Sequence, residues 1–214
     1  MAQDFSPANA IMRLFIAADL SDEAKQAIAA EQRRIAVSLG RSGDSVKLVR
    51  PGQMHLTLLF LGEVPEARVP AVVETMNIPV DQAAFEIAFG GAGVFPPRGA
   101  PRVLWIGVTT GAATLTNLQS EIAGRIRRLD IGFDDRPFHP HLTIGRWRES
   151  RRSGRRDGGA LGGSGTVATV RVTRATLYQS QLSSSAPAYT ALAHATLTGA
   201  GTESRILNRF CCYC

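Results

Sequence analysis

The feature of this sequence that most limits its possible folds is a repeated strand–helix–strand pattern. In the first copy, an apolar strand at residues 13–18 and a helix lead to the segment His-Leu-Thr-Leu at 55–58. In the second copy, an apolar strand at 103–108 and a helix lead to His-Leu-Thr-Ile at 141–144. Because internal repeats constrain architecture strongly, the two copies predict two related lobes that face each other and argue against a solenoid.

The pattern of apolar residues predicts a mixed α/β chain. Strands are expected at residues 11–18, 46–49, 54–62, 85–95, 103–108, 138–147, 167–179 and 189–197. Helices are expected at residues 22–39, 67–76 and 112–129. Ser21 is a suitable N-cap for the first helix, because acidic residues follow it in the first turn, and Gly40 ends that helix.

Composition places the chain among ordinary globular proteins. Its 214 residues are 44% hydrophobic and 20% charged, and no apolar run approaches the roughly 20 residues of a membrane span. The first ten residues do not have the pattern of a secretory signal, so a cytoplasmic protein is expected. The net charge of +6 is carried almost entirely by arginine. It fits a phosphate or nucleic-acid ligand, and it also fits a genome rich in arginine codons.

Each His-x-Thr segment places an imidazole and a hydroxyl on one face of a strand. Side chains alternate along a strand, so His55 and Thr57 project together from the first segment, and His141 and Thr143 from the second. The alternate positions are expected to be buried: Met54, Leu56, Leu58 and Phe60 in the first segment, and Leu142 and Ile144 in the second.

This pairing suits the cleavage of a phosphodiester. Hydrolysis needs a base that takes a proton from water and an acid that protonates the leaving oxygen, and histidine titrates in the range where it can do either. A threonine hydroxyl can donate a hydrogen bond to a phosphoryl oxygen. A zinc site is the less favoured alternative, since no Asp, Glu or Cys accompanies the histidines on either strand. A single such motif would more often be a half-buried structural histidine.

With their flanking residues, these segments resemble the two-histidine phosphoesterase superfamily, and within it the RNA 2′,3′-cyclic phosphodiesterases, also named 2′-5′ RNA ligases. The resemblance covers about residues 11–197. Its strongest parts are RLFIA at 13–17, VRP at 49–51, HLTLLFLG at 55–62, PRVLWIG at 101–107 and FHPHLTIGR at 138–146.

The resemblance implies an α/β (α+β) fold of two pseudo-twofold-related lobes, with antiparallel sheets lining a central cleft and helices outside. It implies metal-independent hydrolysis of RNA 2′,3′-cyclic phosphate ends to 2′-phosphomonoesters without a cofactor, together with the reverse 2′-5′ ligation. Separately from the resemblance, a monomer is expected. His55 would be the proton donor and His141 the proton acceptor. Thr57 and Thr143 would bind the phosphoryl oxygens.

Two alternatives to this expectation remain, one in the same function class and one in a different class. One is a phosphodiesterase acting on small cyclic nucleotides or ADP-ribose cyclic phosphate, and the other is a non-catalytic module that binds RNA ends. Arg146 follows the second motif on its strand and is a candidate phosphate ligand or a plain surface residue. His139 and His194 are expected to be peripheral, and Phe138 to pack in the core.

The expected organisation has one domain with three less regular segments. Residues 1–10 form an N-terminal extension, residues 11–198 the bilobal domain, and residues 199–214 a tail. An arginine- and glycine-rich loop at 148–165 interrupts the domain. All three cysteines, Cys211, Cys212 and Cys214, lie in the tail, so no disulfide framework is expected and a dispensable tail is favoured over a metal site.

Overall fold

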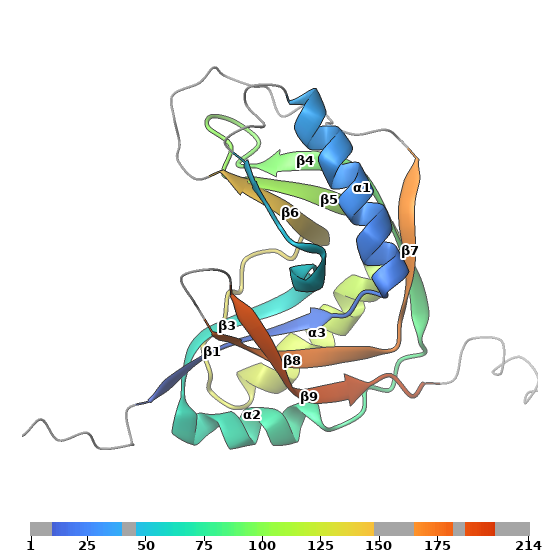
Figure 1. The fold of residues 1–214 in the computed structure, drawn as a ribbon. Helices are drawn as coiled ribbons and strands as arrows, with labels where there is room; N and C mark the ends of the chain where they lie inside the picture. The colour runs from blue at the N-terminus through green and yellow to red at the C-terminus, as the bar shows by residue number, and fades with distance from the viewer. Residues whose placement is uncertain (1–9, 40–45, 148–164, 182–186, 200–214) are drawn as a thin grey trace, which may run out of the picture.

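The computed structural model describes residues 10–39, 46–147, 165–181 and 187–199, and its frame is a pair of curled antiparallel sheets (Figure 1). Sheet A has the strand order β3-β1-β8-β9, and sheet B the order β2-β6-β5-β4-β7. The strands of sheet A are β1 (Ile11–Ala18), β3 (Leu56–Pro65), β8 (Arg174–Gln181) and β9 (Ala188–Thr196). Those of sheet B are β2 (Val46–Leu48), β4 (Phe85–Phe95), β5 (Val103–Thr110), β6 (His141–Trp147) and β7 (Thr166–Val172).

The two sheets repeat one arrangement, as the sequence predicts. Four strands of sheet A, β3-β1-β8-β9, correspond in order to β6-β5-β4-β7 of sheet B. β1 pairs antiparallel with β3, and β5 pairs antiparallel with β6. The two His-x-Thr segments therefore begin equivalent strands of the two sheets.

Each of the two long helices, α1 (Asp22–Ser38) and α3 (Ala112–Arg127), contacts the sheet to which its preceding strand does not belong. α2 (Val69–Met76) is shorter, and η3 (Pro51–Gln53) and η4 (Glu66–Arg68) are short 3₁₀ turns. α1 follows β1 of sheet A but packs against β6 and β7 of sheet B (Figure 1). α3 follows β5 of sheet B and lies against β3 of sheet A and α2, and also against β4 of sheet B. The buried side chain of Gln32 on α1 donates to the carbonyls of Val49 (2.8 Å) and Ile144 (2.5 Å). This amide fixes α1 to β6.

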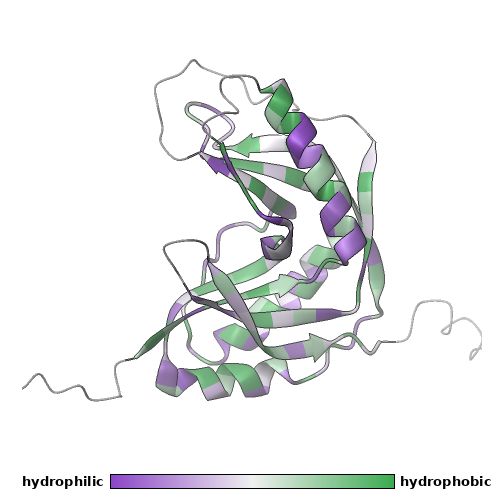
Figure 2. Cartoon of the chain, viewed as in Figure 1, coloured by the Kyte–Doolittle hydropathy of each residue, from purple (hydrophilic) through white to green (hydrophobic). Residues whose placement is uncertain are grey.

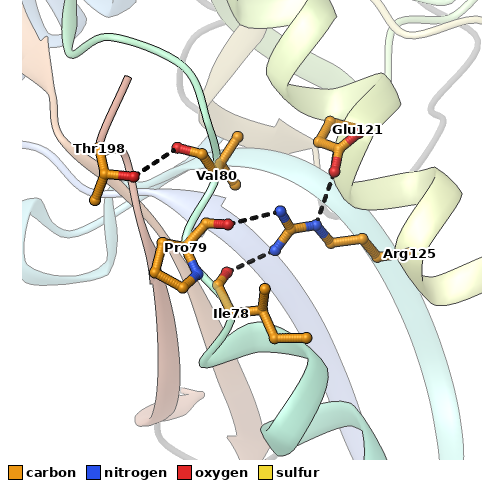
Figure 3. Close-up of polar contacts among 6 residues, drawn as sticks. All are labelled: Ile78, Pro79, Val80, Glu121, Arg125 and Thr198. Carbon is orange, nitrogen blue, oxygen red and sulfur yellow. Dashed lines mark hydrogen bonds and ion pairs between the residues drawn. The ribbon is translucent and has the colours of Figure 1, made fainter. Parts of the chain in front are cut away.

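A buried arginine joins α3 to the segment that follows α2 (Figure 3). Arg125 is 8% exposed, and its guanidinium donates to the carbonyls of Ile78 (2.6 Å) and Pro79 (2.8 Å). Its Nε also donates to Glu121 one helical turn away (2.9 Å). Burial of such a charge is tolerable because hydrogen bonds satisfy it, so this arginine has a structural role.

The apolar faces of the strands and helices form the core between each sheet and its helices. Hydrophobic and hydrophilic bands alternate along the strands in Figure 2. Ser21 accepts a hydrogen bond from the N–H of Ala24 (3.2 Å) and so caps α1 as predicted. No helix in the described part of the chain is long and apolar enough to cross a membrane. The predicted extension, arginine-rich loop and cysteine-containing tail lie almost entirely outside the described residues.

The strand expected at residues 167–179 is in fact two strands in different sheets. β7 ends at Val172 in sheet B, and β8 begins at Arg174 in sheet A. Before Thr173 the buried positions are even-numbered (Ala168, Val170 and Val172), whereas the buried apolar positions after it are odd-numbered (Ala175 and Leu177). The change of parity marks the point where the chain crosses from one sheet to the other.

The expectation that Phe60 is buried with Leu58 is wrong. Leu58 and Leu59 are both buried, whereas Phe60 is 49% exposed. In the pairing with β1, Ile16 lies opposite Leu59 and Ala17 opposite Thr57, so Leu58 is the extra residue of a β-bulge. A bulge reverses the alternation beyond it, and Phe60 consequently lies on the same face of sheet A as Thr57.

Candidate active site

The two histidines occupy matching positions at the starts of equivalent strands. His55 immediately precedes β3, and His141 is the first residue of β6. Each histidine and its following threonine (Thr57 or Thr143) is half-buried, whereas Leu56 and Leu142 between them are fully buried. The predicted alternation is confirmed at both motifs.

Both imidazoles are held in the same way. Nδ1 of His55 lies 2.8 Å from the carbonyl oxygen of Gln53, and Nδ1 of His141 lies 2.6 Å from that of His139. A carbonyl oxygen can only accept, so each Nδ1 carries the hydrogen. Nε2 is therefore the basic nitrogen of each neutral ring, or the acidic N–H of each protonated ring.

Aromatic rings enclose His55 on sheet A. The ring of Phe15 lies 4.7 Å away at a 34° tilt, and the ring of Tyr189 meets it edge-on at 5.1 Å. Burial is the largest effect on the pKa of His55 and lowers it, and the charge of Arg146 lowers it further. The hydrogen bond to Gln53 acts in the opposite direction. The neutral form of this histidine is consequently favoured in the free protein.

Asp19 is a nearby negative charge that favours the protonated form of His55. It follows β1 directly and accepts hydrogen bonds from the hydroxyls of Tyr178 (2.6 Å) and Thr176 (2.8 Å) and from Arg174 (3.1 Å). The ring of Tyr178 stacks on Phe15 at 5.3 Å, and burial raises the pKa of its hydroxyl. Asp19 is thus linked through two aromatic rings to the imidazole.

His141 lies among the aromatic residues of sheet B. Phe95 meets its ring edge-on at 5.1 Å, and Trp105 lies 6.3 Å away. Burial again lowers the pKa most, and the charges of His139 and Arg146 lower it further, whereas the backbone hydrogen bond to His139 raises it. Unlike the pKa of His55, the pKa of His141 is not raised by a nearby carboxylate.

A second β-bulge places Arg146 on the histidine-bearing face. Thr143 pairs with Trp105 and Gly145 with Leu104, which leaves Ile144 as the extra residue. Strict alternation would have put the side chain of Arg146 on the face of β6 opposite to that of Thr143, but the bulge places both side chains on the same face. Its side chain is exposed, and no hydrogen bond or ion pair engages it within the described residues.

The charge of Arg146 reaches both halves of the site. It lowers the pKa of His141 on its own strand, and also those of His55 and Tyr189, which belong to sheet A. The structure thus brings the two motifs into the electrostatic range of a single guanidinium. An anion in this position would interact favourably with that charge.

The remaining predicted residues are placed as follows. His194 is exposed on the edge strand β9, His139 is exposed ahead of β6, and Phe138 packs against the core, as expected. The described residues contain no cluster of three or more His, Cys, Asp or Glu side chains that could hold a metal ion. The sequence analysis did not identify Asp19 or the aromatic rings around the imidazoles. The only sequence signal for these rings was that the aromatic residues occupy alternate positions on neighbouring strands.

Comparison with known proteins shows which family this chain matches. The model for "LigT like Phosphoesterase" matches residues 19–105 and 106–189. A protein of Archaeoglobus fulgidus is 40% identical over 136 residues (63% of this chain and 72% of that protein), and one of Methanothermobacter thermautotrophicus is 31% identical over 183 residues (84% and 95%). Both are named RNA 2′,3′-cyclic phosphodiesterase. A Geobacillus stearothermophilus protein of the same name is 38% identical, but the match spans only 41% of its length.

Solved structures agree with the sequence relatives. The protein TT0787 of Thermus thermophilus has a TM-score of 0.68 and 30% identity, covering 89% of this chain and all of that one. E. coli LigT complexed with 3′-AMP also has a TM-score of 0.68, with 27% identity and coverage of 88% and 99%. With the family match extending through both His-x-Thr motifs, the chain belongs to the LigT-like phosphoesterase family.

Proposed function

We propose that this protein hydrolyses the 2′,3′-cyclic phosphate end of RNA to a 2′-phosphomonoester. The observation that carries the proposal is the matched pair of imidazoles, each with Nδ1–H held by a backbone carbonyl and Nε2 left for proton transfer. The names of the relatives supply the substrate class.

In the proposed reaction, His141 is the base and His55 the acid. Nε2 of neutral His141 takes a proton from water as the water oxygen attacks phosphorus. The bond from phosphorus to the 3′ oxygen breaks, and Nε2–H of protonated His55 gives its proton to that oxygen. This division of roles is the one that the family resemblance implies; burial lowers the pKa of both histidines, and Asp19 is the one carboxylate that favours the protonated form of His55.

Three further side chains are proposed to hold the phosphoryl group. Thr57 and Thr143 lie one same-face position beyond the histidines, about 7 Å along each strand. Their hydroxyls would donate to the non-bridging oxygens, where charge accumulates in the transition state. Arg146 would add a charge-assisted hydrogen bond to the same group.

The test is turnover of an RNA oligonucleotide with a 2′,3′-cyclic end in excess chelator, with the product position identified by chromatography. His55→Ala and His141→Ala are each expected to lower kcat about 100- to 10,000-fold. His194→Ala is the matched control, because His194 also lies in a His-x-Thr segment on a strand but is exposed at the edge of sheet A. Turnover that depends on added zinc, or that survives either active-site substitution, would contradict the proposal.

The same experiment separates the alternatives. Binding without turnover would indicate a module that only holds RNA ends, and preference for a cyclic mononucleotide or ADP-ribose cyclic phosphate over the oligomer would indicate a small substrate. Reverse 2′-5′ ligation stays a prediction, to be tested with a 5′-hydroxyl RNA and a cyclic-ended RNA at high concentration.

We also propose that the protein acts in the cytoplasm, as a monomer without a cofactor, through one domain spanning residues 11–198. The location is supported by an RNA substrate, and the monomer by the fact that a single chain supplies both motifs. Sedimentation of the active species at the mass of a dimer would contradict the monomer.

A further inference from the structure

We propose that Lys47 binds the phosphate that precedes the terminal nucleotide of the RNA, so that the enzyme prefers an RNA strand to a cyclic mononucleotide. Lys47 is the middle residue of β2, and it lies directly opposite Arg146 of β6 in the antiparallel pairing. The group that it recognises is the internucleotide phosphodiester on the 5′ side of the nucleotide that carries the cyclic phosphate. The inference rests on the proposed function, since it assigns a second phosphate position for the same substrate.

The strand register places Lys47 on the face of sheet B that carries the catalytic residues. Directly opposite residues of an antiparallel pair project from the same face, with Cβ atoms about 4.5–5.5 Å apart. The bulge at Ile144 puts Arg146 on the face of the second His-x-Thr motif, so its partner Lys47 projects from that face too. Lys47 is exposed, whereas its two neighbours on β2 are half-buried. The face that holds the reacting phosphate therefore carries two adjacent cations.

No carboxylate neutralises this pair of cations. The strands β2, β5 and β6 contain no Asp or Glu. In the described parts of the chain, no ion pair engages Lys47 or Arg146, whereas Arg13, Arg125 and Arg174 each pair with a carboxylate. Like charges directly opposite each other destabilise a sheet. A bound polyanion relieves this repulsion, which points to a ligand with more than one phosphate.

The spacing on the sheet sets Lys47 back from the reacting phosphate. Arg146 is the next same-face residue after Thr143, roughly 7–10 Å along β6, and Lys47 is on the neighbouring strand, about 4.8 Å further across the sheet. Each nucleotide of RNA carries one phosphate, so the phosphate next to the reacting one is a single nucleotide away. Lys47 suits this next phosphate, while Arg146 and Thr143 serve the reacting one.

A purely structural role for Lys47 makes a different prediction. β2 is an edge strand of sheet B, and a lysine on an edge strand often prevents unwanted pairing with another sheet. That role needs the positive charge but is indifferent to the charge of the RNA linkage. The two roles are therefore separated by changing the charge of the substrate as well as that of the protein.

The test compares two cyclic-ended RNA dinucleotides that differ only in the internucleotide linkage, one with a normal phosphodiester and one with an uncharged methylphosphonate. Lys47→Gln is expected to lower kcat/KM about 3- to 30-fold on the phosphodiester and to leave kcat/KM on the methylphosphonate unchanged. Lys47→Arg should keep the preference for the phosphodiester. Lys25→Gln is the matched control, because Lys25 is the only other lysine of the chain and lies on α1, paired with Asp22 (3.2 Å).

Equal losses on the two dinucleotides, or no loss on either, would overturn the phosphate contact while leaving the proposed function intact. If the wild type cleaves neither dinucleotide, the proposed function fails. The contact is then judged by equilibrium binding of the two uncleaved dinucleotides. A weaker affinity of Lys47→Gln for the phosphodiester alone supports it, and an equal change for both linkages refutes it.

Discussion

Replacing Gly93 by alanine is expected to destabilise the protein and to disturb the active site near His141. Gly93 on β4 pairs with Trp105 on β5, and a Cβ at residue 93 would lie 2.3–2.8 Å from three carbons of the indole ring. Carbon atoms do not approach so closely, so the ring must move. Overpacking of this kind costs about 1–3 kcal/mol, equivalent to a fall in Tm of roughly 2–12 °C for a protein of this size.

The displaced indole is also expected to affect turnover. Trp105 contacts Phe95 at 5.3 Å and lies 6.3 Å from the ring of His141. Since a shift of about 1 Å in a catalytic group can cost up to 100-fold in rate, Gly93→Ala should lower kcat at temperatures where the variant remains folded. Urea denaturation and initial rates on the same preparation give both quantities.

A double-mutant cycle with Trp105→Leu tests the stated cause. The indole N–H is buried and has no hydrogen-bond partner among the described residues, so removing it leaves no acceptor without a donor. With the ring gone, Gly93→Ala should change the free energy of unfolding by less than about 0.5 kcal/mol. Gly52→Ala is the control, because a Cβ there meets nothing within 4 Å. An equal cost of Gly93→Ala in both backgrounds would refute the reasoning.

Three further predictions concern the charges of the molecule. The pH profile of kcat/KM should be bell-shaped, with both apparent pKa values below the ordinary histidine value of about 6.5, because burial lowers the pKa of both His55 and His141; limbs above pH 7 would contradict this. Arg146→Gln removes a charge that lowers both pKa values, so the optimum should move to higher pH while kcat/KM falls about 10-fold or more; an unmoved optimum would show that this charge does not act on the histidines. Arg125→Ala leaves two backbone carbonyls without donors and should lower the free energy of unfolding by about 2–5 kcal/mol; a loss below about 1 kcal/mol in urea titration would disprove the structural role.

Local patterns in the sequence were sufficient to predict most of the elements and the orientation of the histidines. Fully buried Leu56 and Leu142 alternate with half-buried neighbours, so His55 and His141 follow from period-two alternation alone. The sequence also shows the change from even-numbered to odd-numbered apolar positions at Thr173, although the segment around it was predicted as one strand. These features depend on residues adjacent in the chain.

The features that escaped prediction depend on pairing between distant segments. The bulge at Leu58 arises because the paired part of β1 has one residue fewer, and the bulge at Ile144 arises in the same way opposite β5. The sequences of β3 and β6 alone do not show this difference in residue number. Phe60 was therefore predicted on the wrong face, and the face of Arg146 could not be settled. The packing of α1 on sheet B was also hidden, since an apolar stripe shows that a helix is buried but not which sheet covers it.

The crossing of α1 and α3 between the sheets makes the two repeats mutually dependent. A chain divided between β4 and β5 would leave α1 in one fragment and β5 and β6 of its supporting sheet in the other. Neither fragment would hold a complete core, so the two would be expected to acquire structure only on association. The doubled sequence pattern therefore does not divide into two self-sufficient halves, since a helix of each repeat packs against a strand of the other sheet.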